Sequence, residues 1–467
     1  MNQFSPTRHL VLVPLLAALA LVGCATGTVI QPSDLPTAPT VFKENSGIHH
    51  LANVSTPQEQ GLWWQVFSDP MLDQLVEQAN HNNNSIQVAA ARLAQARAIA
   101  GLTEANRAVQ LGLTTGAVRQ KDVTTANMPQ TQISAGANLS YEVDLFGKLS
   151  GATDAASLDA KSRDALLRST QLLVQAEVTQ TYLSLRATDS ERALVRDTLL
   201  AYRNTLQLTE VRYKEGDVAE LDVARVRSEV ASTESEALAL DQRRAQLEHT
   251  LAVLVGEVAS NFSVQPTDWA TALPAIPAGV PSTVLTRRPD ISAAQSSMQA
   301  AQARVGVAKV AWFPNLSLTA NGGYASPEVK DLFTLSARAW GVGALLSLPV
   351  LDGGKREAGL LSANAELSMA LANYREQVLV AFREVEDQLS SLRLLAEQSE
   401  AQARSVASSS RATQLSDARY RNGFVSQLEL LDARRSELRN RRQALQVRAA
   451  QYQATVGLIR ALGGGWA

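Results

Sequence analysis

The sequence has very few of the side chains that carry catalysis or bind transition metals. It contains one cysteine and five histidines, and none of them falls at the spacing of a zinc site or a thiol–histidine pair. Lysine and arginine number 43 and aspartate and glutamate 45, which leaves a net charge of -2. A balanced charge gives no electrostatic attraction to nucleic acid. These shortages argue against an enzyme, a resident metal or cofactor, and a nucleic-acid partner.

The N-terminal apolar run is too short to cross a membrane. It extends from Leu10 to Val22 after two basic residues, whereas a membrane-spanning helix needs about 20 apolar residues. This arrangement is typical of a signal peptide, predicted here at residues 1–23. The run ends in Leu-Val-Gly-Cys, which resembles the bacterial lipobox. Cys24 is therefore expected to carry a covalent lipid such as palmitate, at the start of an extended segment over 24–62. The alternative is an incidental cysteine.

The residue after the cysteine bears on the destination of the protein. Ala25 stands there rather than aspartate, and by resemblance to sorted lipoproteins this favours the outer membrane. Several acyl chains would anchor the mature chain firmly, at about 0.8 kcal/mol for each buried methylene.

The sequence repeats itself after 207 residues. RYKEGDVAELD at Arg212–Asp222 returns as RYRNGFVSQLE at Arg419–Glu429. The same offset relates further pairs: Gly147-Lys148 with Gly354-Lys355, Glu177 with Glu384, and Gly256 with Gly463. A shared offset over so much of the chain indicates a duplicated unit. We predict repeat 1 at 63–258, a proline-rich linker at 259–282, and repeat 2 at 283–467.

Each repeat contains a stretch that predicts a very long helix. In the second repeat, apolar residues recur at alternating steps of three and four: Leu371, Tyr374, Val378, Ala381 and Val385. This is the pattern of a coiled-coil seam. The corresponding helix of the first repeat covers 149–213 and would measure about 97 Å.

Glycines follow where a helical hairpin would turn. Gly216 comes after the first long helix and Gly423 after the second, each three residues beyond a tyrosine, Tyr213 or Tyr420. A second helix then leads to a further glycine in each repeat. The repeated motif is thus predicted to be a hairpin tip, and the two tyrosines either pack the tip or take part in gating.

Before each long helix the apolar period changes from 3.6 to 2. Alternating segments occur at 133–141, 316–324 and 340–348, with a less regular one at 111–118. Segments of about ten residues that are apolar on one face and small or polar on the other fit transmembrane β-strands. A half-buried soluble sheet is the alternative. In a membrane, Tyr141, Tyr324 and Trp340 would form aromatic girdles at the strand ends.

Four strands cannot close a barrel. An open sheet edge in hydrocarbon would leave backbone groups unpaired, so spanning strands require an oligomer. Eight strands enclose a lumen filled by side chains, whereas a channel needs more. Two copies, with eight strands, or three copies, with twelve, would close a barrel, and three copies are the expectation. The predicted fold class is an α+β membrane protein, internally duplicated, with four strands per protomer in a 12-stranded trimeric β-barrel.

With these elements placed, the chain resembles the TolC/OprM family of outer-membrane efflux factors, in its lipoprotein branch. The residues that carry the resemblance are WWQVFSDPMLDQL at 63–75, YEVDLFGKL at 141–149, LTRRPDISAAQ at 285–295 and AWFPNLSL at 311–318. The most specific of them, Arg288-Pro289-Asp290, has a structural interpretation: proline suits a first helical turn and aspartate the positive helix N-terminus. We expect a helix from there to Trp312 and no transport chemistry.

The resemblance implies a homotrimer that is the exit duct of a tripartite multidrug efflux pump. Its barrel would continue as a long α-helical coiled-coil barrel across the periplasm. The duct would dock on a periplasmic adaptor (membrane fusion) protein and an inner-membrane transporter of the RND type, and would pass drugs or other small solutes passively through the outer membrane. Energy would come from the transporter, since Gly147-Lys148 lacks the rest of a phosphate-binding loop.

The resemblance also assigns a gate to the hairpin tips. Family channels carry acids just after these turns, and the matching residues are Asp222, Glu429 and Asp432. Acids around a constriction repel anions and bind cations; the alternative for each is a solvated position on a coiled-coil face. An arginine that helps to lock the closed mouth elsewhere in the family is replaced by Val425. That leaves open whether the acids are latched by Arg212, Arg225, Arg419 or Arg421.

Two other functions share parts of this pattern. A duct for type I polypeptide secretion has the same fold. A lipid-anchored periplasmic coiled-coil scaffold would explain the cysteine and the long helices, but it gives the alternating strands no purpose.

Overall fold

The computed structural model describes residues 36–44, 62–121, 129–277, 279 and 281–465. The predicted signal peptide 1–23, the lipidation site Cys24 and most of the segment 24–62 lie outside the described residues. The described residues divide into two compact units: the first contains Gln95–Lys161 and Gln295–Tyr374, and the second contains those of Thr37–Ala94, Ser162–Ala294 and Arg375–Ala467. Both halves of the sequence therefore contribute to each unit.

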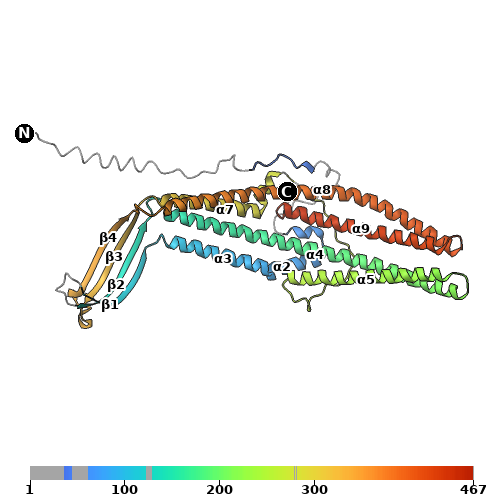
Figure 1. Ribbon diagram of the computed structural model, residues 1–467, viewed down its shortest axis with the longest axis horizontal. Helices are drawn as coiled ribbons and strands as arrows, with labels where there is room; N and C mark the ends of the chain where they lie inside the picture. Colours follow the sequence, from blue (N-terminus) through green and yellow to red (C-terminus); the bar gives the residue numbers. More distant parts are fainter. Residues whose placement is uncertain (1–35, 45–61, 122–128, 278, 280, 466–467) are drawn as a thin grey trace, which may run out of the picture. The chain divides into compact units, whose positions relative to one another are not determined.

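The elements follow the same order in both halves of the chain (Figure 1). The first half has η4 (Trp63–Phe67), α2 (Pro70–Asn82), α3 (Asn84–Ala105), β1 (Gln110–Lys121), β2 (Pro129–Val143), α4 (Lys148–Lys214) and α5 (Glu220–Leu254). The second half has α6 (Pro281–Arg287), α7 (Pro289–Val310), β3 (Asn315–Ser326), η5 (Val329–Asp331), η6 (Leu335–Ala337), β4 (Arg338–Ser347), α8 (Lys355–Arg421) and α9 (Gln427–Ala461). The predicted sequence of helix, two strands, long helix, hairpin and second helix is present in each.

The two long hairpins match residue for residue. Helices α4 and α8 have 67 residues each, and α5 and α9 have 35 each. Every boundary of α4 and α5 lies 207 residues before the corresponding boundary of α8 and α9. The predicted helix 149–213 is one residue short at each end of α4. At about 1.5 Å per residue, α4 and α8 each extend about 100 Å.

Helix α7 and strand β4 end earlier than predicted, in each case shortly before a proline. Helix α7 ends at Val310 rather than Trp312, because Pro314 disfavours the helical conformation at the residue before it. Strand β4 ends at Ser347, one residue before the predicted end, and Pro349 cannot donate to a strand ladder.

The strands form one antiparallel sheet in the order β1-β2-β3-β4, which lies in the first unit (Figure 1). Two glycines allow its central strands to approach closely, because Gly136 of β2 pairs with Gly323 of β3. A Cβ on Gly136 would lie 2.8 Å from the carbonyl oxygen of Gly322, and a Cβ on Gly323 would overlap the carbonyl oxygen of Ala135. Any side chain at either position would push the two strands apart.

The core of the second unit is rich in aromatic residues. Tyr452 of α9 packs against Trp269 and Phe67, with ring centroids 4.9 and 6.3 Å apart. The guanidinium of Arg448 lies over the Trp269 ring, 4.5 Å from its centroid. Fully buried Trp63 donates its indole N–H to Gln175 over 3.0 Å. These contacts bring η4, α4, α9 and the linker between the two halves into one core.

The N-terminus of α2 shows how a polar side chain is satisfied in this core. Asp69 caps the helix by accepting from the backbone N–H groups of Met71 and Leu72 over 3.1 and 3.3 Å, and Pro70 occupies the first helical position. The hydroxyl of Tyr182 donates to the same carboxylate over 2.8 Å.

No helix among the described residues is long and apolar enough to cross a membrane.

Residues 36–44 form a short strap on α8. The backbone N–H groups of Lys43 and Glu44 donate to the two carboxylate oxygens of Glu386 over 2.8 and 3.0 Å. The side chain of Glu44 pairs with Arg393 over 3.0 Å, and Phe42 is buried. One α8 carboxylate thus fixes the strap through its backbone.

Candidate functional site

The register of the sheet gives it two chemically different faces. Leu111, Leu139, Ala320 and Val342 lie side by side across the four strands, and residues paired in this way point to one face. Continuing the alternation, that face also carries the following residues: Leu113, Ile133, Ala137, Tyr141, Leu316, Leu318, Tyr324, Trp340 and Leu346. Leu113, Val342 and Trp340 are 85, 77 and 80% exposed. This face is thus a contiguous apolar surface whose large side chains are exposed.

The opposite face carries mostly small and polar side chains, with Val118 and Leu345 as the apolar exceptions. Its central row is Gly112, Asn138, Asn321 and Gly341, one residue from each strand. The Asn138 carboxamide covers the glycine of β1 and the Asn321 carboxamide covers the glycine of β4, because a Cβ on either glycine would lie 2.9 Å from the amide oxygen. Ser134, Ser140 and Thr319 lie on the same face. Such a surface suits contact with water rather than hydrocarbon.

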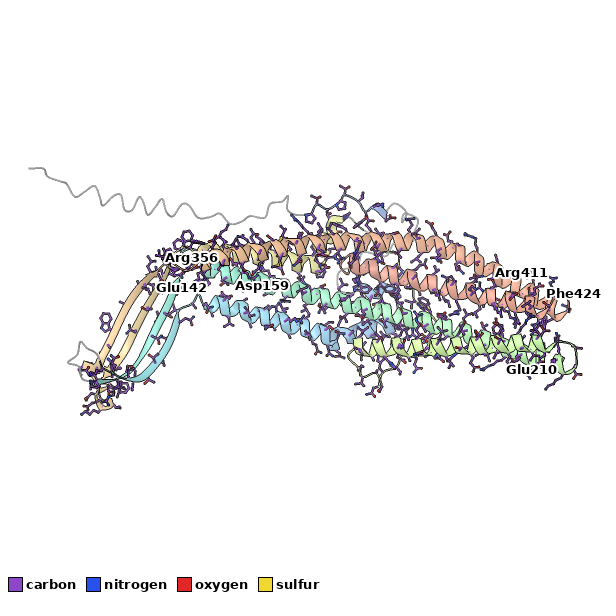
Figure 2. The ribbon with its side chains drawn as sticks, viewed as in Figure 1. Glu142, Asp159, Glu210, Arg356, Arg411 and Phe424 are labelled. Carbon is purple, nitrogen blue, oxygen red and sulfur yellow. The ribbon has the colours of Figure 1, made fainter. Side chains whose placement is uncertain are left out.

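The turn after β2 is built from charged residues. Asp144 accepts the backbone N–H groups of Leu149 and Ser150 over 3.0 and 2.8 Å, which caps α4. Lys148 pairs with Glu142 over 3.1 Å. Glu142 and Arg356 both lie where strands meet helices in the first unit (Figure 2). Lys148 is thus a structural partner at a strand-to-helix turn.

Both hairpin tips have the same backbone geometry. Gly216 and Gly423 have φ values of +83° and +74°, in the left-handed region that glycine tolerates. Each glycine N–H donates to the carbonyl of a tyrosine three residues earlier, Tyr213 or Tyr420, over 3.0 Å. Glycine in this position ends the helix and lets the chain reverse. At the second tip Phe424 is 75% exposed (Figure 2).

The three predicted gate acids lie in the first two turns of α5 and α9, and each pairs locally. Arg225 lies 3.8 Å from Asp222, and Arg419 lies 3.4 Å from Glu429. Asp432 pairs over 3.3 Å with Arg435, a partner that sequence reasoning missed although it stands three residues away on the same helix. Every one of these pairs stays within a single hairpin.

The other two arginines considered as latches have different contacts. Arg421 pairs with Asp417 over 2.8 Å within α8. The guanidinium of Arg212 lies over the ring of Tyr420, 5.3 Å from its centroid, and so joins the first hairpin to the second. The Tyr420 hydroxyl is buried without a hydrogen-bond partner, which fits a packing role. Tyr213 is half exposed.

Polar contacts that the sequence did not reveal also join the two hairpins. The side-chain amide of Gln427 donates to the hydroxyl of Thr209 over 2.7 Å in a buried setting. Arg434 of α9 donates to the hydroxyl of Thr205 of α4 over 2.7 Å and pairs with Asp417 of α8 over 3.0 Å. These contacts tie three of the four hairpin helices together near the tips.

A groove of about 450 Å³ runs between α5 and α9. Arg442 in its wall pairs with Glu191 and Glu236 over 2.7 and 3.0 Å. Tyr202 lies at its base, 1% exposed, and its hydroxyl has no hydrogen-bond partner. Burial, reinforced by the negative charge of Glu229, raises the pKa of Tyr202 to about 12. The two glutamates of its wall, Glu229 and Glu236, are both paired with arginines of α9, Arg435 and Arg442, so the groove is lined by ion pairs.

The motif Arg288-Pro289-Asp290 lies at the start of α7 and also contacts the end of α9, the last helix of the second repeat. Arg288 is buried and pairs with Asp290 over 2.6 Å and with Glu384 of α8 over 2.7 Å. It also donates to the carbonyl oxygen of Ala461, the last residue of α9, over 3.2 Å. Burial alone would lower the pKa of Arg288, but the hydrogen bonds and charges of the two carboxylates outweigh it and raise the pKa. The guanidinium therefore stays charged in the core.

In the first repeat a different side chain joins the start of α3 to the end of α5. Asn83 caps α3 by accepting the N–H groups of Ser85 and Ile86, and its amide donates to the carbonyl oxygen of Leu254 over 2.8 Å. Leu254 precedes Ala461 by 207 residues. A neutral amide in one repeat thus replaces the buried ion cluster of the other. Within the described residues, no group of histidine, cysteine and acidic side chains is arranged to hold a metal ion.

Comparison with known proteins agrees with this geometry. Residues 75–257 and 280–464 match the family "Outer membrane efflux protein". The chain is 33% identical over 465 residues to the pyoverdine export outer membrane protein OpmQ of Pseudomonas aeruginosa, covering 97% of this chain and 96% of that one. It is 29% identical over 461 residues to the cation efflux system protein CusC of Escherichia coli, covering 97 and 99%.

The solved structures agree as well. The outer-membrane channel OprN superposes with a TM-score of 0.87 at 30% identity, covering 95% of this chain and 100% of that one. A CusC structure superposes with a TM-score of 0.83 at 28% identity, covering 95 and 100%. The fold class is therefore that of outer-membrane efflux channels, with a β-barrel and an α-helical periplasmic barrel.

The chain belongs to the outer membrane efflux protein family. It is an outer-membrane channel of an efflux system, as its resemblance to the TolC/OprM family predicted.

Proposed function

We propose that three copies of this chain form a passive exit duct for small solutes in a tripartite efflux pump. The observation that carries the proposal is a four-stranded sheet with one apolar and one small or polar face, whose outer strands β1 and β4 each pair on one side only. In hydrocarbon those open edges must pair with another copy. Three copies supply twelve strands, enough to enclose a channel with the polar face inside.

The mass of the detergent-extracted protein tests this proposal. Light scattering with the detergent contribution subtracted should give three times the mass of one mature chain. A folded monomer would contradict the duct, because its sheet edges could not lie in the membrane.

Small solutes are the proposed cargo, rather than polypeptides. Its relatives OpmQ and CusC are named for pyoverdine export and for cation efflux. The protein itself contributes a passage and no catalytic step, and the inner-membrane transporter, proposed to be of the RND type, supplies the energy. The periplasmic adaptor is proposed to meet the hairpin tips, where exposed Phe424 and Leu221 offer apolar contacts.

We further propose that the six hairpin tips of the trimer form the gate at the periplasmic mouth. Asp222, Glu429 and Asp432 would surround the constriction and favour cations. In place of an arginine at Val425, the closed state would be held by the contacts between hairpins: Gln427 with Thr209, Arg434 with Thr205, and Arg212 with Tyr420.

Cys24 is proposed as the lipid anchor, and 63–258 and 283–467 as the two repeats, joined by the linker 259–282. Mass spectrometry of the mature N-terminal peptide tests the anchor. An acylated cysteine at the new N-terminus is expected, and an unmodified Cys24 within a longer chain would contradict it. The strap that Glu386 holds would then follow the anchor along the chain.

A further inference from the structure

Charged residues within the four strands are few and unevenly placed. The strand sequences contain four of them: Arg119, Lys121, Glu142 and Arg338. Glu142 lies at the end of the sheet nearest the helices and is paired with Lys148. The three basic residues all lie at the other end, where loops join β1 to β2 and β3 to β4 (Figure 1).

The register places all three basic residues on the apolar face. Arg119 and Lys121 alternate in phase with Leu111 and Leu113 of β1. Arg338 alternates in phase with Trp340 of β4 and pairs with Tyr324 in the neighbouring strand. A charge on the lipid face is costly at mid-membrane and tolerated only near the interface. Their place at the loop end of the strands meets that condition.

These basic side chains are also available to a ligand. All three are exposed, and no ion pair joins them to any residue that the structure describes. Charges at the helix end are instead paired: Lys148 with Glu142, and Arg356 with Asp352 over 2.6 Å. The loop end of the apolar face therefore carries positive charge that no described residue neutralises through an ion pair.

The loop between β3 and β4 adds apolar contacts beside them. Phe333 packs edge to face on Tyr324, with ring centroids 5.4 Å apart, and is itself exposed, as is Leu335. Two acids occur in this loop, Glu328, which is paired with Lys330 over 2.7 Å, and Asp331. Exposed aromatic and apolar groups next to basic side chains are typical of a membrane interface.

We propose that the loop end of the apolar face, called the rim and formed by Arg119, Lys121 and Arg338 with Phe333 and Trp340 beside them, binds the phosphate groups of lipids in the outer leaflet of the membrane. Arg119, Lys121 and Arg338 would contact phosphate, while Phe333 and Trp340 lie against the acyl chains. This inference rests on the proposed trimer for one further step. When β4 of one copy pairs antiparallel with β1 of the next, its Arg338 comes to the same end of the junction as Arg119 and Lys121 of that neighbour, so each junction would hold one cluster.

Lipid titration of the full-length protein tests the proposal. Native mass spectrometry would measure the affinity for diphosphoryl lipid A and for the same lipid stripped of both phosphates. The variant R119Q/K121Q/R338Q is expected to bind the phosphorylated lipid about a hundredfold more weakly, since each of the three basic groups near an anionic surface contributes about fivefold. Its affinity for the dephosphorylated lipid should stay at the wild-type value.

Two controls separate a phosphate site from general charge or misfolding. R168Q/R227Q/R383Q removes the same number of charges from exposed helix positions of the second unit and should bind as the wild type does. The single variant R338Q, which leaves β1 intact, should lose about fivefold. Equal affinity of wild type and triple variant, or equal binding of both lipids by the wild type, would overturn the inference.

The proposed trimer is judged on the same samples by light scattering. If the protein is a trimer but binds both lipids equally, the phosphate site is contradicted and the proposed duct is not. A monomer whose affinity still depends on phosphate and on Arg338 supports the rim and contradicts the duct.

Discussion

The side-chain amide of Gln427 donates a hydrogen bond to Thr209 over 2.7 Å and joins the first residue of α9 to the final turns of α4. The acceptor has a second bond, because the Thr209 hydroxyl also donates to the carbonyl of Thr205 over 2.8 Å. Gln427 itself leaves its amide oxygen buried without a partner. The link between the hairpins is therefore easy to remove without leaving a new unsatisfied group.

Replacing Gln427 by leucine should loosen the closed gate and leave the fold intact. A hydrogen bond worth about 1 kcal/mol corresponds to about a fivefold shift between closed and open states. Conductance of Q427L in planar bilayers should rise accordingly, with little change in unfolding temperature. The matched control is E220L, at the same helix position of the first hairpin, where the side chain is exposed. Wild-type conductance in Q427L would remove this contact from the latch.

The gate acids predict a loss of selectivity. The triple variant D222N/E429Q/D432N removes nine negative charges from a trimer's tips, and cation selectivity measured by reversal potential across a salt gradient should fall. The shape of the side chains is preserved, so conductance should change less than selectivity. E397Q, an exposed acid in the middle of α8, serves as the control. Unchanged reversal potential would place the three acids on a solvated helix face instead.

Arg288 predicts a large stability effect. Replacing it by methionine would leave partly buried Asp290 without its cation and Glu384 with only the more distant Arg460, at 3.5 Å. The loss of one partner of a buried cluster costs about 3–5 kcal/mol. R288K should not rescue fully, because lysine cannot reproduce the forked contacts to two carboxylates and a carbonyl. Thermal unfolding followed by circular dichroism measures both variants against R383M, an exposed arginine of α8. Wild-type stability of R288M would show the cluster to be dispensable.

Two buried tyrosines with equally high pKa values should differ in how much stability the protein loses when their hydroxyl is removed. The pKa of each is raised to about 12, first by burial. The Tyr182 hydroxyl donates to Asp69 and accepts from Arg186, whereas that of Tyr202 has no partner. Y182F should lose about 1–3 kcal/mol of unfolding free energy, and Y202F should lose none. A destabilised Y202F would reveal a hydrogen bond at the base of the groove.

Protonation of Asp241 should account for part of the loss of folding stability at low pH. Partial burial alone would raise its pKa, but hydrogen bonds and charge from Arg192 and Arg196, at 2.6 and 2.8 Å, lower it below the ordinary value. A carboxyl whose folded pKa is depressed stabilises the protein above its unfolded pKa, about 3.9, and loses that contribution as the pH falls through the folded pKa.

Unfolding temperatures measured from pH 7 to pH 2 test this expectation. D241N should unfold at a lower temperature than wild type at pH 7, and the two curves should approach each other below about pH 4. D387N, whose carboxyl is exposed, should follow the wild type. A constant gap between D241N and wild type across the range would assign the effect to packing rather than to the charge.

The sequence was sufficient for the parts of the fold that repeat at short range. The 3-4 spacing of Leu371 to Val385 and the alternation at 133–141 each arise from one element burying or exposing one face, so they can be read locally. Glycine before the long helices and at the tips marks backbone that other residues avoid. For this reason α4, β2 and the tip turns were placed within a few residues.

The contacts between elements could not be found in that way. Thr209 and Gln427 are 218 residues apart, and Arg288 and Glu384 are 96 apart; nothing in a single sequence links such pairs. Asp432 with Arg435 is different, because a spacing of three on one helix is a visible signal. The sequence motif at Arg288 was correctly placed at a helix start, but its role in holding the end of α9 needed the three-dimensional structure.

The equal lengths of the two hairpins limit how this gene can change. An inserted turn in α4 alone would displace one tip along its axis by about 5.4 Å and leave α5, α8 and α9 out of step with it. Length changes are therefore acceptable only when four separate sites change together, and they must come in whole turns to keep the seams in phase. Substitutions can accumulate independently in the two halves, as the replacement of an arginine cluster by Asn83 illustrates. Insertions and deletions should instead collect in the loops between strands and in the linker.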